Sequence, residues 1–174
     1  MKIEPLGDLR RHEDIEEWSV SDPIPVPYLG NQKVKFIVEG IEDDNSPEDF
    51  SISIKQFLSL SESDQLGAAP YLFHEYRRAA NVLDEEDLLV HVGAVSEVWR
   101  HVQMTAIYVS RRHRADNLVY VQVTGNCGWD PEHGIQVVFR RGNVLARVSS
   151  QDGHLTTADA YALPEDQNTI VYGT

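Results

Sequence analysis

The sequence predicts an α+β fold, in which a β-rich N-terminal segment and a helical middle precede an antiparallel four-stranded sheet. Three observations lead to this class. Apolar residues recur with helical spacing in the middle of the chain, they alternate with polar residues from Met104 onwards, and short turn sequences separate several of the alternating stretches. Because strands, then helices, then strands follow one another in blocks, the class is α+β.

The N-terminal segment is polar and extended. Residues 1–17 are rich in charge, and we expect them to form a loose lead-in to a single domain spanning 1–174. Prolines then alternate with apolar residues over 23–28, which allows an extended chain but not a full ladder of hydrogen bonds, so this stretch is expected at a sheet edge. The alternation over 33–40 predicts a regular strand.

The middle of the chain carries helical signals. Apolar side chains recur every three or four residues, and serines stand where helices would begin. The spacing predicts helices over 47–60, 64–83 and 95–102. Residues 51–54 also alternate, which leaves a short strand there as an alternative.

The C-terminal half carries strand signals. Period-two alternation predicts strands at 104–112, 117–124, 134–141 and 143–149. Gly142 favours a tight hairpin between the last two because glycine accepts positive φ. Short connections favour an antiparallel meander.

Composition narrows the class of partner. The chain of 174 residues has 28 acidic and 15 basic residues, a net charge of −13, which argues against a nucleic-acid partner. Its longest strongly apolar runs have four residues, too short to cross a membrane, and no secretory signal is visible. A lone Cys127 cannot form an intrachain disulfide. We therefore expect a cytoplasmic protein of bacterial type with no membrane partner.

The charge is unevenly spread along the sequence. Residues 1–50 hold 13 acids and 5 bases, whereas 100–147 hold seven arginines and three acids, with a basic run at 111–114. An acidic face and an arginine-bearing sheet can therefore coexist, which suits a protein partner. The alternative is that both faces are simply solvated.

Two stretches gather side chains that could carry chemistry. We expect the sheet to bring together the connection at 125–134 and the residues after the last strand. The candidates are Cys127, Trp129, Asp130, Glu132, His133, Asp152 and His154.

These side chains admit several interpretations. They include metal-ligand types, but their spacing matches no closed zinc pattern. The order around Cys127 differs from that of papain-like enzymes, and only 47 residues follow it. Asp130 and Glu132 lack a visible sugar-binding context. The structural alternative has Trp129 buried against the strand ends, with Glu132 and His133 hydrogen-bonded. No catalytic residue, metal or cofactor is assigned, since no phosphate loop or dinucleotide pattern occurs either.

The chain resembles an uncharacterised family of bacterial domains. Two motifs carry most of the likeness: Cys-x-Trp-x-x-Glu-His-Gly and Arg-Val-Ser-x-x-Asp-Gly-His-Leu-Thr. Gly128 departs from it, since an acidic residue would be expected before Trp129. The blocks that resemble the family are 23–36, 47–60, 70–77, 98–102, 127–134 and 147–156. The resemblance implies no specific function, although some similar small acidic proteins are suspected of neutralising toxins.

Two hypotheses about function follow. The first is a non-enzymatic protein-binding module, of immunity or regulatory type, that captures a basic protein partner through its negative charge. The second is a small metal-assisted hydrolase that uses Asp130, Glu132, His133, Asp152 and His154 around one metal or water.

Overall fold

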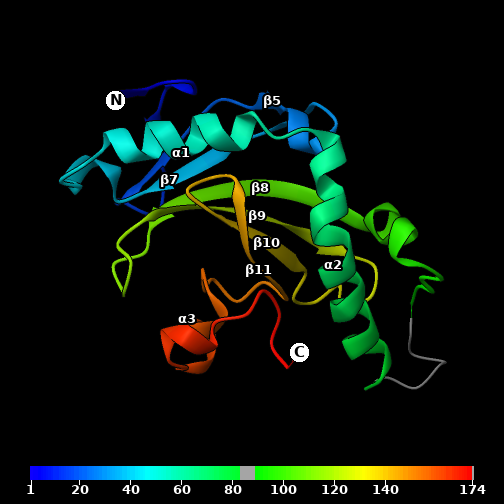
Figure 1. Cartoon of the computed structure of the whole chain (residues 1–174). Helices are drawn as coiled ribbons and strands as arrows, with labels where there is room; N and C mark the ends of the chain where they lie inside the picture. The colour runs from blue at the N-terminus through cyan, green and yellow to red at the C-terminus, as the bar shows by residue number, and fades with distance from the viewer. Residues whose placement is uncertain (83–88, 174) are drawn as a thin grey trace.

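The computed structural model describes residues 1–82 and 89–173, and it has the predicted α+β class. Its main feature is a seven-stranded sheet with the order β11-β10-β9-β8-β7-β4-β3 (Figure 1). The strands of this sheet are β3 (Arg10–Arg11), β4 (Trp18–Val20), β7 (Phe36–Glu39), β8 (Val102–Arg111), β9 (Val119–Cys127), β10 (Ile135–Arg140) and β11 (Val144–Ser149).

The remaining elements are two small β-ribbons and the helices. One ribbon pairs β1 (Lys2–Ile3) with β2 (Gly7–Asp8), and the other pairs β5 (Ile24–Val26) with β6 (Gln32–Val34). The α-helices are α1 (Glu48–Leu58), α2 (Gln65–Ala80) and α3 (Thr157–Tyr161). The 3-10 helices are η1 (Pro27–Leu29), η2 (Ile41–Asp43), η3 (Glu62–Asp64), η4 (Val95–His101) and η5 (Glu165–Gln167).

The sheet is larger than the expected four strands. Strands β8 to β11 correspond to the four predicted strands and pair antiparallel in chain order. On the other side of β8, however, β7 pairs with it in parallel, with Phe36 opposite Ile107. This parallel pairing is possible because α1 and α2 lie in the connection between the two strands, as a parallel crossover requires a long connection. The N-terminal strands therefore extend the same sheet.

The helical middle differs from the prediction in detail. Residues 51–54 belong to α1, so the alternative short strand is wrong there. The second helix starts at Gln65 and ends at Ala80, and its predicted last residue, Leu83, lies outside the described residues. The third predicted helix, 95–102, is a 3-10 helix ending at His101.

The first residues are packed rather than loose. Ile3, Leu6 and Leu9 are buried in the hydrophobic core, and β3 forms one edge of the main sheet. The lead-in expected over 1–17 was inferred from its charged residues, but the apolar residues spaced three apart between those charges are the ones that anchor it.

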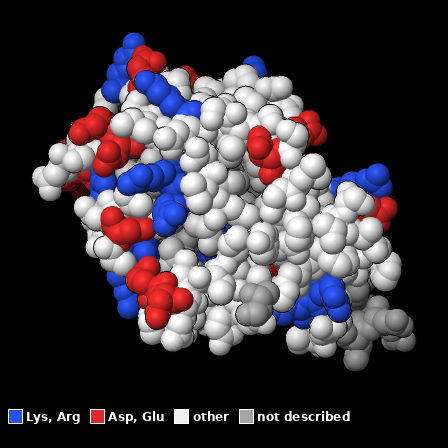
Figure 2. Space-filling model, in the orientation of Figure 1, with Lys and Arg blue, Asp and Glu red and all other residues white. Residues whose placement is uncertain are grey.

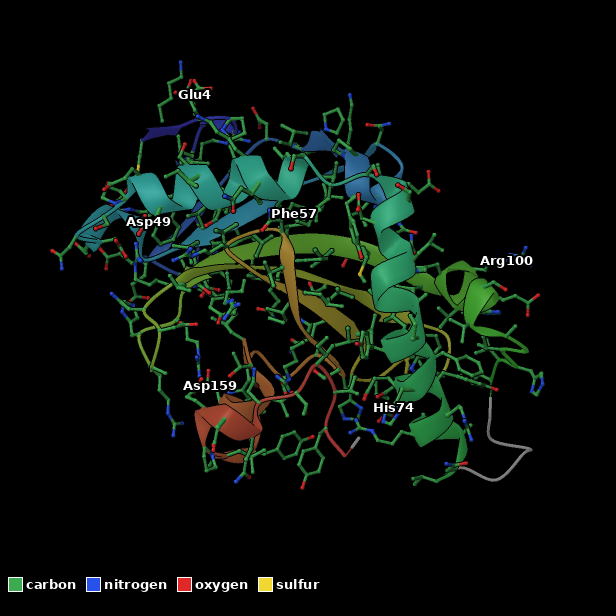
Figure 3. The ribbon with its side chains drawn as sticks, in the orientation of Figure 1. Glu4, Asp49, Phe57, His74, Arg100 and Asp159 are labelled. Carbon is green, nitrogen blue, oxygen red and sulfur yellow. The ribbon has the colours of Figure 1, made fainter. Side chains whose placement is uncertain are left out.

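The apolar core lies between the sheet and α1. Alternate residues of the central strands point to this face, where Phe50, Ile54 and Phe57 of α1 cover them. Figure 3 shows Phe57 between α1 and the strands. The β10–β11 hairpin reaches the same helix: Gly142 has a φ of +87°, and a Cβ there would clash with the carbonyl oxygen of Ser53. Glycine is therefore required at this turn.

The opposite face of the sheet is polar, and the C-terminal segment covers it (Figure 1). Gln122 donates a hydrogen bond to Gln136 on the neighbouring strand (2.6 Å), and Gln136 in turn donates to the carbonyl oxygen of His154 (3.0 Å). Arg112, at the end of β8, donates to Asp159 of α3 (2.6 and 2.9 Å). These bonds attach residues 150–171 to the sheet.

Charges that are separated in sequence are paired in space. Arg111 contacts Asp44 (2.7 Å) and Asp49 (2.9 Å), and Arg112 contacts Asp159. In Figure 2, basic and acidic side chains lie next to one another along one side of the molecule. The expected arginine-bearing surface is therefore wrong for Arg111 and Arg112, because their guanidinium groups are buried in ion pairs with acids of other segments.

Candidate functional site

A hollow of about 660 Å³ lies at the end of the sheet where β9 ends and β10 begins. We call it the α2–loop hollow, because the C-terminal half of α2 forms one wall and the connection after β9 forms the other. Its lining residues are Glu75, Arg78, Ala79, Val82, Leu89, Trp129, Asp130, Pro131, Glu132, His133 and Ser150. It therefore includes four of the candidate residues, namely Trp129, Asp130, Glu132 and His133.

Trp129 anchors the connection, as predicted. Its side chain is 4% exposed and packs edge-on against Tyr76 of α2, with ring centroids 5.9 Å apart. The expected partners were the strand ends, but the aromatic contact is with a helix. Trp129 thus fixes the distance between the two walls of the hollow.

Asp130 organises the polar part of this loop. Its Oδ1 lies 2.8 Å from Nδ1 of His133 and accepts a bond from the His133 amide (3.2 Å), while Ser150 donates to its other oxygen (3.3 Å). The carboxylate raises the pKa of His133 by stabilising the imidazolium. Since Asp130 lies between the serine and the histidine, the histidine does not contact the hydroxyl, and the geometry of a nucleophilic serine is absent from this trio.

Glu132 and Cys127 do not take the roles considered for them. Glu132 is exposed and has no side-chain hydrogen bond to any described residue, so the expected bond is not found. The Cys127 thiol is buried and lies 3.6 Å from the carbonyl oxygen of Asp130. Burial raises its pKa to about 11, which disfavours the thiolate that a nucleophile needs.

Asp152 and His154 are held against the polar face of the sheet. Arg147 is 1% exposed and donates to both carboxylate oxygens of Asp152, at 2.6 Å each, and to the carbonyl oxygen of His154 at 2.7 Å. Neither residue lines the α2–loop hollow. The expected convergence therefore occurs only in part, through Ser150 and Asp130.

This arrangement does not favour a metal centre. Within residues 1–82 and 89–173, no group of three or more His, Cys, Asp or Glu side chains is placed to hold a metal ion. Both oxygens of Asp152 already accept bonds from Arg147, which accounts for part of this result.

Glu75 is a buried acidic residue of the hollow that is not among the candidates from the sequence. It is 3% exposed, and its Oε2 pairs with Arg78 at 2.8 Å. Its Oε1 is buried without a hydrogen-bond partner among the described residues. Burial raises the pKa of Glu75, an effect that Arg78 and the Ser150 amide partly oppose. The signal in the sequence was an acidic residue three positions after Leu72, on the apolar side of the helix.

The rim of the hollow is apolar and exposed. Val82 is 82% exposed and Leu89 is 72% exposed, and these two lining residues are called the rim. Exposed aliphatic side chains beside a concave site are typical of surfaces that are covered by a partner. The hollow thus combines an apolar rim with the carboxyl groups of Glu75, Asp130 and Glu132.

The structure thus has an α+β fold with a hollow at one end of its sheet. The chain belongs to DUF6985, a family described as a domain of unknown function, whose match covers residues 5–155. The resemblance to an uncharacterised family is thereby confirmed. No curated protein and no solved structure matches the chain. None of the described helices is both long and apolar enough to cross a membrane.

Proposed function

We propose that this protein is a non-enzymatic protein-binding module of immunity or regulatory type, acting in the cytoplasm, and that its basic protein partner docks over the α2–loop hollow. The observation that carries the proposal is the hollow itself, which exposed Val82 and Leu89 line together with the carboxyl groups of Glu75, Asp130 and Glu132. Such a combination of apolar contact and negative charge suits a partner surface that carries both apolar and basic side chains.

The chemistry of the nearby groups supports binding over catalysis. The Cys127 thiol is buried with a raised pKa, and Asp130 already accepts bonds from His133 and Ser150. Asp152, another acidic candidate, is paired with Arg147. These groups are engaged in holding the loop and the C-terminal segment, whereas a general base or nucleophile needs access to substrate.

The proposal is tested by affinity capture from the native host with three baits. The wild-type chain is compared with Val82→Ser/Leu89→Ser, which alters the rim, and with Ile52→Ser/Leu66→Ser, which alters two exposed apolar side chains outside the hollow. We expect one partner that is captured by the wild type and the control but not by the rim variant, and that elutes as salt rises. Equal capture by all three baits, or no salt-sensitive partner, would contradict the proposal.

A further inference from the structure

One residue that lines the α2–loop hollow, Glu75, carries a buried acceptor without a hydrogen-bond partner among the described residues. Oε1 of Glu75 has no hydrogen-bond partner among the described residues, although the side chain is 3% exposed. Leaving a buried carboxyl oxygen unpaired is unfavourable, and such groups are uncommon in folded proteins. Because Glu75 lines the hollow, a ligand that enters it can supply the missing donor.

The charges around this acceptor favour a cation. Three carboxyl groups line the hollow, from Glu75, Asp130 and Glu132, against one guanidinium group, from Arg78, and the His133 imidazole. Arg78 is already paired with Oε2 of Glu75, and Asp130 is already bonded to His133. A cationic donor placed at Oε1 would complete the hydrogen bonding of Glu75 without breaking either pair.

The number of available oxygens distinguishes between the two basic side chains. An arginine fork binds a carboxylate best through two oxygens at once, but Arg78 occupies one oxygen of Glu75. A lysine ammonium group is compact and can bind through a single oxygen, and its four-carbon stem is apolar. The stem matches the remaining lining, which includes Trp129, Pro131 and Ala79.

We infer that the α2–loop hollow binds a lysine side chain of the partner protein, with its ammonium group on Oε1 of Glu75 and its stem beside Trp129. The inference rests on the proposed protein-binding function and identifies the group that is recognised. A protein is favoured over a free amine because Val82 and Leu89 on the rim are exposed and would be covered by the surface around the lysine.

The inference is tested with small probes observed by ¹H–¹⁵N NMR. Nα-acetyl-lysine-N-methylamide should bind at least tenfold more tightly than the norleucine analogue, which has the same stem without the charge, and more tightly than the arginine analogue. It should shift the Trp129 indole signal. Glu75→Gln should weaken lysine binding at least tenfold, whereas Glu48→Gln, an exposed carboxyl on α1, should leave it unchanged.

Three results would contradict the inference or limit it. Equal binding of the lysine and norleucine probes to the wild type overturns the inference, and this comparison does not depend on whether Glu75→Gln folds. An acetylated Leu-Lys-Leu amide should bind at least tenfold more tightly than n-butylammonium, with the gain lost in Val82→Ser/Leu89→Ser. If n-butylammonium binds equally well, a protein lysine is the wrong source. A salt-sensitive partner lost in the rim variant, without a lysine preference, overturns this inference but not the proposed function.

Discussion

Arg147 and Asp152 form a two-pronged ion pair in which the guanidinium is almost completely buried, with both N–O distances at 2.6 Å. The pair joins β11 to the segment that follows it, and Gln136 donates a further bond to the same carboxylate (3.1 Å). Arg147 also lowers the pKa of Asp152, although burial of that carboxyl acts in the opposite direction. The Arg-Val-Ser-x-x-Asp-Gly-His-Leu-Thr motif thus holds the chain against the polar face of the sheet.

Replacing Asp152 alone should lower the free energy of unfolding more than replacing Asp152 and Arg147 together. Among the described residues, Asp152→Ala leaves the buried guanidinium with the carbonyl oxygen of His154 as its hydrogen-bond acceptor, and we expect a loss of about 3 kcal/mol in the free energy of unfolding. In Arg147→Met/Asp152→Ala no charge remains to be buried, so part of the stability should return. Urea denaturation measures both. The exposed pair of Arg10 and Asp22 provides the control, since Asp22→Ala should change stability by about 0.5 kcal/mol or less.

Trp129 should contribute more to stability than its charged neighbour. Trp129→Ala removes a buried aromatic that packs on Tyr76, and we expect it to cost about 3 kcal/mol. Glu132→Gln changes an exposed side chain and should leave the melting temperature nearly unchanged. Thermal unfolding of the two variants checks this. If Trp129→Ala melted like the wild type while Glu132→Gln unfolded, the loop would be held by its charge.

The sequence predicted where the strands lie better than it predicted which strands pair with one another. Period-two alternation located β8 to β11 because apolar residues of these strands are buried in the core that α1 and α2 cover. It could not show that β7 lies parallel to β8, because the alternation within a strand does not identify which strand it pairs with. The short strand β3 was missed for another reason: it consists of Arg10 and Arg11, two exposed charged residues at the sheet edge.

The candidate site was predicted in part. Proximity of the connection after β9 to the residues after β11 follows from antiparallel order, and the bond of 3.3 Å from Ser150 to Asp130 reflects it. The direction in which Asp152 points was not predictable, because the sequence does not show that Arg147 is buried beside it. Glu75 was missed because its interest as a binding group depends on a buried oxygen without a hydrogen-bond partner, which only tertiary structure reveals.

The C-terminal segment beyond the family match should be required for stability. Although the match ends at residue 155, Asp159 of α3 accepts two bonds from Arg112, whose pKa it raises. Asp159→Ala should therefore cost about 3 kcal/mol, since it leaves a buried guanidinium without its best partner. Glu165→Ala, which removes the more exposed partner of the same arginine, should cost less. Equal unfolding midpoints in urea for these two variants would contradict this assignment.

The single thiol should be protected in the folded protein. Burial raises the pKa of Cys127 to about 11, so the thiolate fraction at pH 8 should fall by about two orders of magnitude relative to an exposed thiol. Reaction with Ellman's reagent should be at least that much slower in buffer than in urea. The signal is unambiguous because the chain has one cysteine. Rapid modification of the folded protein would show that Cys127 is accessible and would reopen a chemical role for it.

Glu75 should make stability depend on pH in a direction opposite to that of the paired aspartates. Burial raises its pKa, against the influence of Arg78, Arg147 and the Ser150 amide and together with that of Asp152. The folded state therefore holds the proton more tightly than the unfolded state does. The contribution of Glu75 is most favourable below its unfolded pKa, near 4.3, and is lost as pH rises through the folded value.

Glu75→Gln cannot titrate, so its stability relative to the wild type isolates this effect. We expect the free energy of unfolding of Glu75→Gln minus that of the wild type to increase as pH rises through this window and then to level off. Urea denaturation at a series of pH values measures the difference, with Glu48→Gln as the control for removing one exposed negative charge. A difference that decreases with rising pH would mean that Arg78 and the Ser150 amide outweigh burial. Oε1 of Glu75 would then already be satisfied within the protein, and the reason for expecting a cationic ligand in the hollow would be removed.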